Sequence, residues 1–170
     1  MKKNNYIDLA KKASNIQINE LKKIKKVFNR SFINAVDLIL NCKGKVIFAG
    51  IGKSGLIARK ISATFSSVGI PSFFCDPAQA LHGDMGQIEK KDILIIFSYS
   101  GNTSELTNML KYANRYRIKI IGVASKPDSI LLKASDIKII LPKVKESDLT
   151  GIVPTSSTSI TLLLGDCLAT

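Results

Sequence analysis

Two apolar runs, each followed by a polar turn that contains glycine, constrain the fold of this chain more than any other feature. Residues 46–49 lead into Gly50-Ile51-Gly52-Lys53-Ser54-Gly55, and residues 92–97 lead into Ser98-Tyr99-Ser100-Gly101-Asn102-Thr103-Ser104-Glu105. A helical pattern of apolar residues follows each turn. The chain is therefore predicted to contain two buried strands that each feed a helix. Because ligands of parallel α/β sheets bind at the carboxyl ends of the strands, we expect the two turns to hold one ligand between them.

The remaining sequence repeats the alternation of strand and helix. Strands are predicted over residues 71–75, 119–124 and 137–142, and helices over residues 54–68, 105–116 and 128–134 and from Thr155 onward. Short connections between alternating elements are typical of a mainly parallel sheet with helices on both faces. We therefore expect an α/β fold, a three-layer α-β-α sandwich around a five-stranded, mainly parallel sheet.

A long helical segment is predicted to precede the sheet. Between Tyr6 and Leu40, apolar residues recur at near-helical spacing with lysines between them, and the stretch contains neither glycine nor proline. We expect residues 1–40 to form helices, in two pieces, that pack on the core or on a neighbouring subunit, and residues 41–170 to form one domain. The last helix is still apolar at Thr170, so we expect this domain to be truncated at its C-terminal end.

Length and composition exclude several classes of protein. The 170 residues are 45% hydrophobic and 22% charged, which suits one domain with a real core and excludes a disordered chain. No apolar run approaches the length of a membrane span, and residues 1–6 lack the apolar core of a signal peptide. The three cysteines are scattered without metal-ligand spacing, which favours reduced thiols. We therefore expect a cytoplasmic protein with no membrane partner.

The net charge of +12 raises the question of nucleic-acid binding. Residues 1–30 hold nine Lys or Arg and two Asp or Glu, so +7 of the net charge lies in the first helical region. A helix with one solvated, lysine-rich face accounts for this distribution. No sequence motif of a nucleic-acid-binding fold accompanies it, and we expect no nucleic-acid partner.

The first polar turn has the chemistry of a phosphate site. The N-terminus of a helix presents backbone N–H groups without an internal partner, and Lys53 adds a positive charge there. The spacing differs from a Walker loop, and no acidic ribose partner follows as in a dinucleotide-binding motif. The hydroxyl clusters Ser98–Thr103 and Thr155–Thr158 are compatible with ordinary helix capping. Two such clusters that converge on one place favour a bound ligand.

Four motifs, in their order and spacing, resemble those of sugar isomerase (SIS) domains. They are the segments Gly50–Gly55, Pro77–Asp84 with the preceding Phe73-Phe74, Ser98–Glu105 and Pro154–Thr158. The chain is most similar to bacterial D-arabinose-5-phosphate isomerases, and the similarity covers nearly all of it. The resemblance implies a five-stranded parallel sheet between helices and a homotetramer with sites built between subunits. Such proteins usually carry two CBS domains after the SIS domain, and these 170 residues include none.

The resemblance also implies a reaction. Members of this group interconvert D-ribulose 5-phosphate and D-arabinose 5-phosphate by aldose–ketose isomerisation through an enediol, at the entry to the Kdo sugar of lipopolysaccharide. Such a reaction needs a base near the carbon, a cation or acid near the oxygens and a grip on the phosphate. We expect the chain to bind a phosphosugar and to need no metal or other cofactor.

The family's catalytic pattern carries over to three residues of this sequence, Lys53, Glu105 and Glu146. By the resemblance, Glu146 moves the proton, Lys53 steadies the negative charge on the enediolate oxygens, and Glu105 orients Lys53 or shares in proton transfer. A further catalytic histidine of the family falls past Thr170, so we expect this chain to bind sugar phosphate with little turnover. The expected substrate-binding residues are Gly52, Ser54, Gly69, Ile70, His82, Ser98, Ser100, Gly101, Asn102, Thr103, Thr155, Ser156, Ser157 and Thr158.

The only histidine, His82, lies in a glycine-bounded loop where the family contacts its substrate. Some relatives carry another histidine at the position of Asp76, and there an inhibitory zinc ion binds. Asp76 and His82 are therefore the candidates for such a zinc site in this chain. Because Asp76 departs from that pattern, we expect no metal here.

Two other functions fit the same resemblance. SIS domains also serve as sugar-phosphate-binding modules of transcriptional regulators, which usually carry a helix-turn-helix domain first, and residues 1–40 show no recognisable turn between two short helices. The related 6-phospho-3-hexuloisomerases suit the chain length. The motifs at residues 80–84 and 154–158 fit the arabinose-5-phosphate group better.

Overall fold

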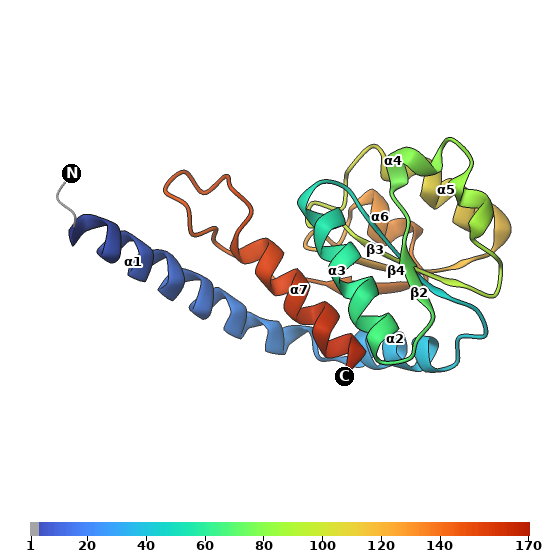
Figure 1. The fold of residues 1–170 in the computed structure, drawn as a ribbon, viewed down its shortest axis with the longest axis horizontal. Coiled ribbons are helices and arrows are strands. Elements are labelled where there is room, and N and C mark those ends of the chain that lie inside the picture. The colour runs from blue at the N-terminus through green and yellow to red at the C-terminus, as the bar shows by residue number, and fades with distance from the viewer. Residues whose placement is uncertain (1–3) are drawn as a thin grey trace.

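All five predicted strands form, and they lie side by side in one parallel sheet (Figure 1). The computed structural model describes residues 4–170. The order across the sheet is β2-β1-β3-β4-β5. The strands are β1 (Val46–Gly50), β2 (Ser72–Phe74), β3 (Ile93–Phe97), β4 (Lys119–Ala124) and β5 (Ile137–Ile140). The parallel five-stranded sheet is thus confirmed.

Helices connect the strands and precede them. The N-terminal helices are α1 (Asn4–Leu21), the 3₁₀ helix η1 (Lys22–Val27) and α2 (Arg30–Leu40). Those within the sheet region are α3 (Lys53–Ser67), α4 (Pro77–Ala80), the 3₁₀ helix η2 (Asp84–Gln87), α5 (Leu106–Tyr116), α6 (Ile130–Ala134) and α7 (Ser156–Ala169). The expected long helical stretch is therefore interrupted near Phe28, between η1 and α2.

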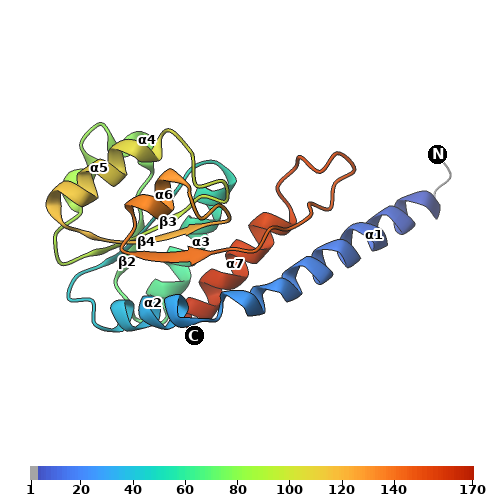
Figure 2. The same ribbon diagram turned by 180° about the vertical axis from the view of Figure 1, so that it is seen from behind.

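The helices form two layers, one on each face of the sheet. Successive residues of β1 alternate between two apolar cores: Val46 and Phe48 enter one, Ile47 and Ala49 the other. The first core is closed by α2, α3 and α7, and the second by α4, α5 and α6 (Figures 1 and 2). Because both faces are covered, β1 and β3 are buried along their whole length, as their unbroken apolar runs predict. The three-layer α-β-α sandwich is confirmed.

The strand order reverses direction at β1. The chain passes from β1 through α3 to β2 on one side, and then crosses to β3 on the other side of β1. The helices α3 and α5 that leave β1 and β3 therefore cover opposite faces of the sheet (Figure 2). Such a switch point leaves a crevice at the carboxyl ends of the two strands, where ligands of α/β proteins bind. The two polar turns of the sequence lie at these ends, next to each other in register, since Gly50 pairs with Phe97.

Helix α1 lies along α7, away from the sheet (Figures 1 and 2). The two helices are linked by the hydroxyl of Ser159, which donates to Oε1 of Gln17 at 3.2 Å. Further along, Ile24 and Val27 of η1 are buried in the first core. The N-terminal half of α1 exposes Tyr6 and Ile7. The division at residue 40 into a helical segment and a domain stays a prediction.

Within residues 4–170, every helix falls short of the length and apolarity that crossing a bilayer requires.

Candidate active site

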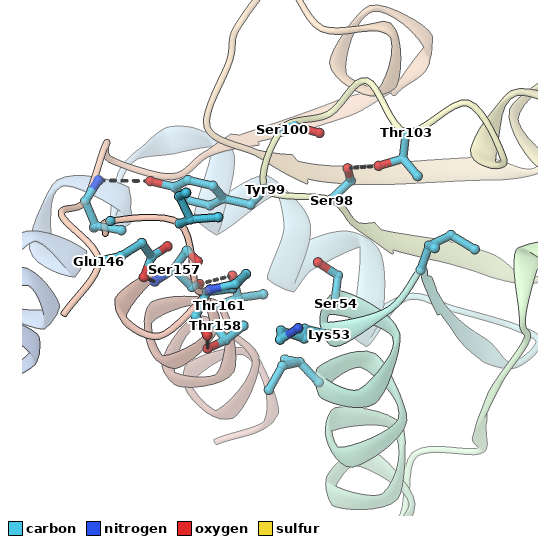
Figure 3. A pocket seen from close by; sticks show the side chains of 16 residues that line it. Lys53, Ser54, Ser98, Tyr99, Ser100, Thr103, Glu146, Ser157, Thr158 and Thr161 are labelled. Atoms are coloured by element: carbon cyan, nitrogen blue, oxygen red, sulfur yellow. Dashed lines mark hydrogen bonds between the residues drawn. The ribbon is translucent and has the colours of Figure 1, made fainter. Parts of the chain in front are cut away.

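A cavity of about 510 Å³ lies at the carboxyl ends of β1 and β3, and the first turn of α7 closes its far side (Figure 3). Three segments that are distant in sequence supply its walls: the β1–α3 turn, the β3–α5 turn, and the stretch from Val144 into α7. The lining residues are Ile51, Lys53, Ser54, Ile57, Ser98, Tyr99, Ser100, Thr103, Val144, Glu146, Gly151, Ile152, Pro154, Ser157, Thr158 and Thr161. Two predicted catalytic residues and six predicted binding residues are thus brought together.

The β1–α3 turn supplies the cation. Helix α3 approaches the end of β1 so closely that a Cβ on Gly55 would lie 2.6 Å from the carbonyl oxygen of Gly50. Gly52, at φ +58°, is the N-cap of α3, and no side chain in the described part of the chain caps this end of the helix. The first N–H groups of α3 are therefore left without a side-chain acceptor from the cap position. Lys53 is exposed, and within residues 4–170 no carboxylate lies within ion-pair distance of it. A cation and a helix N-terminus therefore meet at this rim.

The β3–α5 turn supplies hydroxyls. The hydroxyls of Ser98 and Thr103 are 2.9 Å apart and hydrogen-bonded, and Ser100 Oγ accepts from the N–H of Asn102 at 3.3 Å. Ser98, Ser100 and Thr103 all line the cavity (Figure 3). Asn102 instead points to the neighbouring helix, where its Oδ1 accepts from the N–H of Ile130 at 3.0 Å. The amide side chain thus anchors the turn, and the three hydroxyl residues line the cavity.

Gly101 holds this turn against α6. Its φ is +69°, and an added Cβ would collide with the Ser129 side chain. Gly101→Ala is expected to lower the free energy of unfolding by about 2–4 kcal/mol, since left-handed strain and overpacking add. Gly151→Ala is the matched control, because Gly151 has φ +70° with nothing within 4 Å of the added Cβ. Chemical denaturation checks the pair, and equal losses in both variants would contradict the packing argument.

Glu146 caps the N-terminus of α7 with its carboxylate. Its Oε2 accepts from the N–H of Thr155 at 2.7 Å, from the Thr155 hydroxyl at 2.9 Å and from the N–H of Ser157 at 3.3 Å. Burial acts to raise the pKa of the Glu146 carboxyl, but the hydrogen bonds from Ser157 and Thr155 outweigh it and lower that pKa below its ordinary value. The side chain is therefore an ionised carboxylate at neutral pH.

The hydroxyl side chains of the first turn of α7 make different contacts. Ser157 and Thr158 line the cavity, whereas Thr155 points its hydroxyl at Glu146. Thr158 Oγ1 donates to the carbonyl oxygen of Thr155 at 2.8 Å. Ser156 is fully buried outside the cavity lining, and its Oγ has no hydrogen-bond partner among residues 4–170. The Thr155 side chain does not cap its own helix, so the capping explanation of this cluster does not hold for Thr155.

Several predicted site residues lie outside the cavity lining within residues 4–170. Glu105 is exposed, and its Oε2 accepts from the Ser104 hydroxyl at 2.8 Å. A backbone hydrogen bond at Glu105 itself is the larger cause that lowers the pKa of the Glu105 carboxyl, and the hydrogen bond from Ser104 lowers it further. His82 and Gly69 are also exposed, and Ile70 is half-buried. The roles predicted for these four residues stay predictions.

A second cavity of about 520 Å³ adjoins the first across Lys53, and Gly52 lines it. On its other side the Arg59 guanidinium lies over the Phe74 ring, 4.5 Å from the centroid. Asp76 also lines this cavity, with Oδ1 accepting from the N–H of Ala78 at 2.9 Å as the cap of α4. Across residues 4–170, His, Cys, Asp and Glu side chains form no group of three that could hold a metal ion.

Several residues that line the cavity are not predicted from the sequence, above all Tyr99 and Thr161. Thr161 lies one helical turn beyond Ser157 and Thr158, so its position on the same face of α7 could be read from the spacing. Tyr99 stands between two serines of the predicted site, but a bulky aromatic ring is not expected in a turn that binds phosphate. The apolar wall of the cavity is formed by Ile51, Ile57, Val144 and Ile152. Apolar side chains such as these give no sign in the sequence that they belong to a polar site.

Relatives with this sequence pattern are known. The chain is 41% identical to the Rickettsia prowazekii protein RP505 over 98% of its own length and 52% of that protein. It is 40% identical to the arabinose 5-phosphate isomerase KdsD of Escherichia coli K12, over 88% of this chain and 45% of KdsD. The chain thus spans about half the length of these curated relatives.

The fold has solved counterparts. The structure of E. coli CFT073 c3406 in complex with arabinose 5-phosphate superposes with a TM-score of 0.95 at 34% identity, covering 99% of this chain and 90% of that one. Residues 39–170 match the SIS domain family. The matched range includes both polar turns and the first turn of α7, which line the cavity. The chain therefore belongs to the SIS domain family.

Proposed function

We propose that this chain is the catalytic domain of a phosphosugar isomerase that interconverts D-ribulose 5-phosphate and D-arabinose 5-phosphate through an enediol. The observation that carries the proposal is the placement of Lys53 and Glu146, a cation and a carboxylate from distant segments, on one cavity lined with hydroxyls. The 40% identity to E. coli K12 KdsD supports the choice of substrate. We further propose that the arabinose 5-phosphate formed enters Kdo and lipopolysaccharide synthesis.

The phosphate is best placed between the N-terminus of α3 and the β3–α5 turn. The first amides of α7 already donate to Glu146, so a phosphate there would meet a carboxylate. Neutral hydroxyls on Ser98, Ser100 and Thr103, with the positive end of the α3 dipole, offer an anion favourable contacts instead. In this arrangement the phosphate lies on one side of the cavity and the reacting carbons near Glu146 on the other.

The proton transfer follows from the charge state of Glu146. Starting from the ketose, the ionised carboxylate takes a proton from C1 while the carbonyl oxygen at C2 gains negative charge. Lys53 stabilises that charge electrostatically in a partly enclosed site. Return of the proton to C2, with transfer of the O1 proton to O2, gives the aldose. All atoms are conserved, and no net charge is left.

The activity can be tested directly on the 170-residue chain. We expect saturable binding of ribulose 5-phosphate in a titration and slow conversion to arabinose 5-phosphate, measured by chromatography of the products against a heat-inactivated control. Faster conversion of a 3-hexulose 6-phosphate would assign the chain to the hexuloisomerase class. Tight binding of sugar phosphates without turnover would favour a regulatory module.

We propose that the chain forms a homotetramer whose sites receive residues from neighbouring subunits. Large apolar side chains stand exposed on the 143–154 loop, where Leu149 is 86% and Ile152 78% exposed, and on α2, where Leu40 is 75% exposed. Contact between subunits would bury these side chains and could bring surface residues such as His82 and Glu105 to a neighbour's cavity. Light scattering should then give four times the 18.5 kDa of one chain. A stable monomer would contradict this.

We propose a cytoplasmic location because the three cysteine thiols are free. Cys42, Cys75 and Cys167 are all free, and burial, ahead of the charges of Asp84 and Asp76, raises the pKa of the Cys75 thiol to about 11. Free thiols are typical of proteins kept in a reducing compartment.

A further inference from the structure

The segment 142–147, which carries Glu146 to the cavity, has no regular secondary structure of its own. It follows β5 and runs between the β3–α5 turn on one side and α1 with η1 on the other. A carboxylate on an irregular segment needs other contacts to fix it, because a general base must stay within hydrogen-bond reach of the proton it moves. The hydrogen bonds to this segment come from side chains on both sides.

On the cavity side the contact is Tyr99. Its hydroxyl donates to the carbonyl oxygen of Pro142 at 3.1 Å and accepts from the N–H of Val144 at 2.9 Å. The ring reaches from the β3–α5 turn across the cavity wall toward the segment (Figure 3). Burial, the largest cause, raises the Tyr99 pKa, so the phenol keeps its proton and can donate at neutral pH. One side chain thus spans from the hydroxyl turn to the backbone two residues before Glu146.

On the opposite side the contacts come from α1 and η1. The N–H of Lys145 donates to Oε2 of Glu20 at 3.1 Å, and Lys23 Nζ, paired with the same carboxylate, donates to the carbonyl oxygen of Lys143 at 3.3 Å. The Glu20 side chain is only 15% exposed. The backbone N–H groups of Val144 and Lys145 therefore point to opposite sides of the segment, and each finds a fixed side-chain oxygen.

We propose that Tyr99 and Glu20 are positioning residues that hold Glu146 at the first turn of α7, facing the cavity. Tyr99 also ties the position of this carboxylate to the β3–α5 turn that would bind the phosphate. The phosphate site and the Glu146 carboxylate are therefore held at a fixed separation. The catalytic part of the inference rests on the proposed function. The structural part, that these two contacts fix the Glu146 carboxylate, does not depend on it.

The first test is Tyr99→Phe, which removes one hydroxyl and keeps the ring. We expect kcat to fall about tenfold, the size expected for losing a buried hydrogen bond of ordinary strength, with KM changed less than about twofold. The acidic limb of the kcat profile should move to higher pH, because a displaced Glu146 loses the amides of Thr155 and Ser157 that lower its pKa. Tyr116→Phe, at a half-exposed ring on α5, is the matched control and should behave as the unchanged chain.

A double-mutant cycle separates positioning from a merely structural role. If Tyr99 acts through Glu146, adding Tyr99→Phe to Glu146→Gln should lower the residual rate no further. An independent tenfold loss in that background would overturn the proposal, as would an unshifted pH profile in Tyr99→Phe alone.

The second test needs no turnover. NMR titration of the Glu146 side-chain carboxyl carbon should show a higher pKa in both Tyr99→Phe and Glu20→Ala than in the unchanged chain, and the Val144 amide should exchange faster in Tyr99→Phe. These results would stand even if no sugar phosphate were converted, in which case the proposed function alone fails. An unchanged Glu146 titration in both variants would refute the positioning itself. Glu20→Ala also keeps the test open should Tyr99→Phe not fold.

Discussion

Replacing Lys53 by methionine is expected to lower kcat for ribulose 5-phosphate by about 10²–10³-fold, the range found when a group that stabilises a developing oxyanion is removed. Lys53 supplies the cation among the residues that line the 510 Å³ cavity. Methionine keeps most of the length of the stem and removes the charge that would face the enediolate. Because Lys53 is exposed at the start of α3, the stability of the fold should hardly change.

Lys60→Met is the matched control, since Lys60 lies on the same helix. Its ammonium pairs with Asp166 of α7 at the surface, which contributes little to stability. We expect full activity in this variant. Full activity in Lys53→Met as well would remove the lysine from the mechanism, and a loss confined to KM would make it a binding residue only.

Glu146→Gln is expected to lower kcat by about 10²–10⁴-fold, the contribution typical of a general base. Glutamine keeps an oxygen that can accept from the amides of α7 but cannot take up a proton from carbon. In the unchanged chain, activity should fall as the pH drops through the lowered pKa of Glu146, below the usual range of a carboxyl group. Glu89→Gln is the control, because Glu89 is an exposed carboxylate outside the cavity lining.

Glu146→Gln should also change how the free energy of unfolding depends on pH, and this effect does not depend on catalysis. A carboxyl group whose pKa is lowered on folding stabilises the fold at pH values above its unfolded pKa, and this contribution is lost as the pH falls through the folded value. The free energy of unfolding should therefore decrease less between pH 7 and pH 3 in Glu146→Gln than in the unchanged chain. Parallel pH dependence in the two proteins, measured by urea denaturation, would show that Glu146 does not cap α7 in solution.

The sheet was predictable from sequence because its strands are buried on both faces. An unbroken apolar run such as Ile93–Phe97 leaves few alternatives to a central parallel strand. The errors lie at the ends. The sequence predicts Asp92 within this strand, but its buried carboxylate accepts from the N–H groups of Lys45 and Glu89, so it closes a turn instead. Ser129 similarly caps α6 through the N–H of Leu132, and the helix begins at Ile130 rather than at Asp128.

The site was predictable only in part. Lys53, Ser98 and Ser100 follow strands directly, so the sheet itself determines where they lie. Glu146 lies on an irregular segment, and no pattern of spacing predicts that its carboxylate would reach the α7 amides; only the resemblance to SIS domains selected it. The contact of Tyr99 with Val144 joins residues 45 positions apart and depends on side-chain packing that periodicity does not encode.

The contacts between α1 and the far end of the chain have a consequence for how the protein is made. Glu20 meets Lys145, and Gln17 meets Ser159, across 125 and 142 positions of sequence. During synthesis α1 emerges well before Lys145 and Ser159, so its apolar stripe stays uncovered while the strands between these partners assemble. Closing so long a loop is entropically costly unless the intervening sheet has already formed. Docking of α1, and with it the fixing of Glu146, is therefore expected to follow the assembly of the sheet.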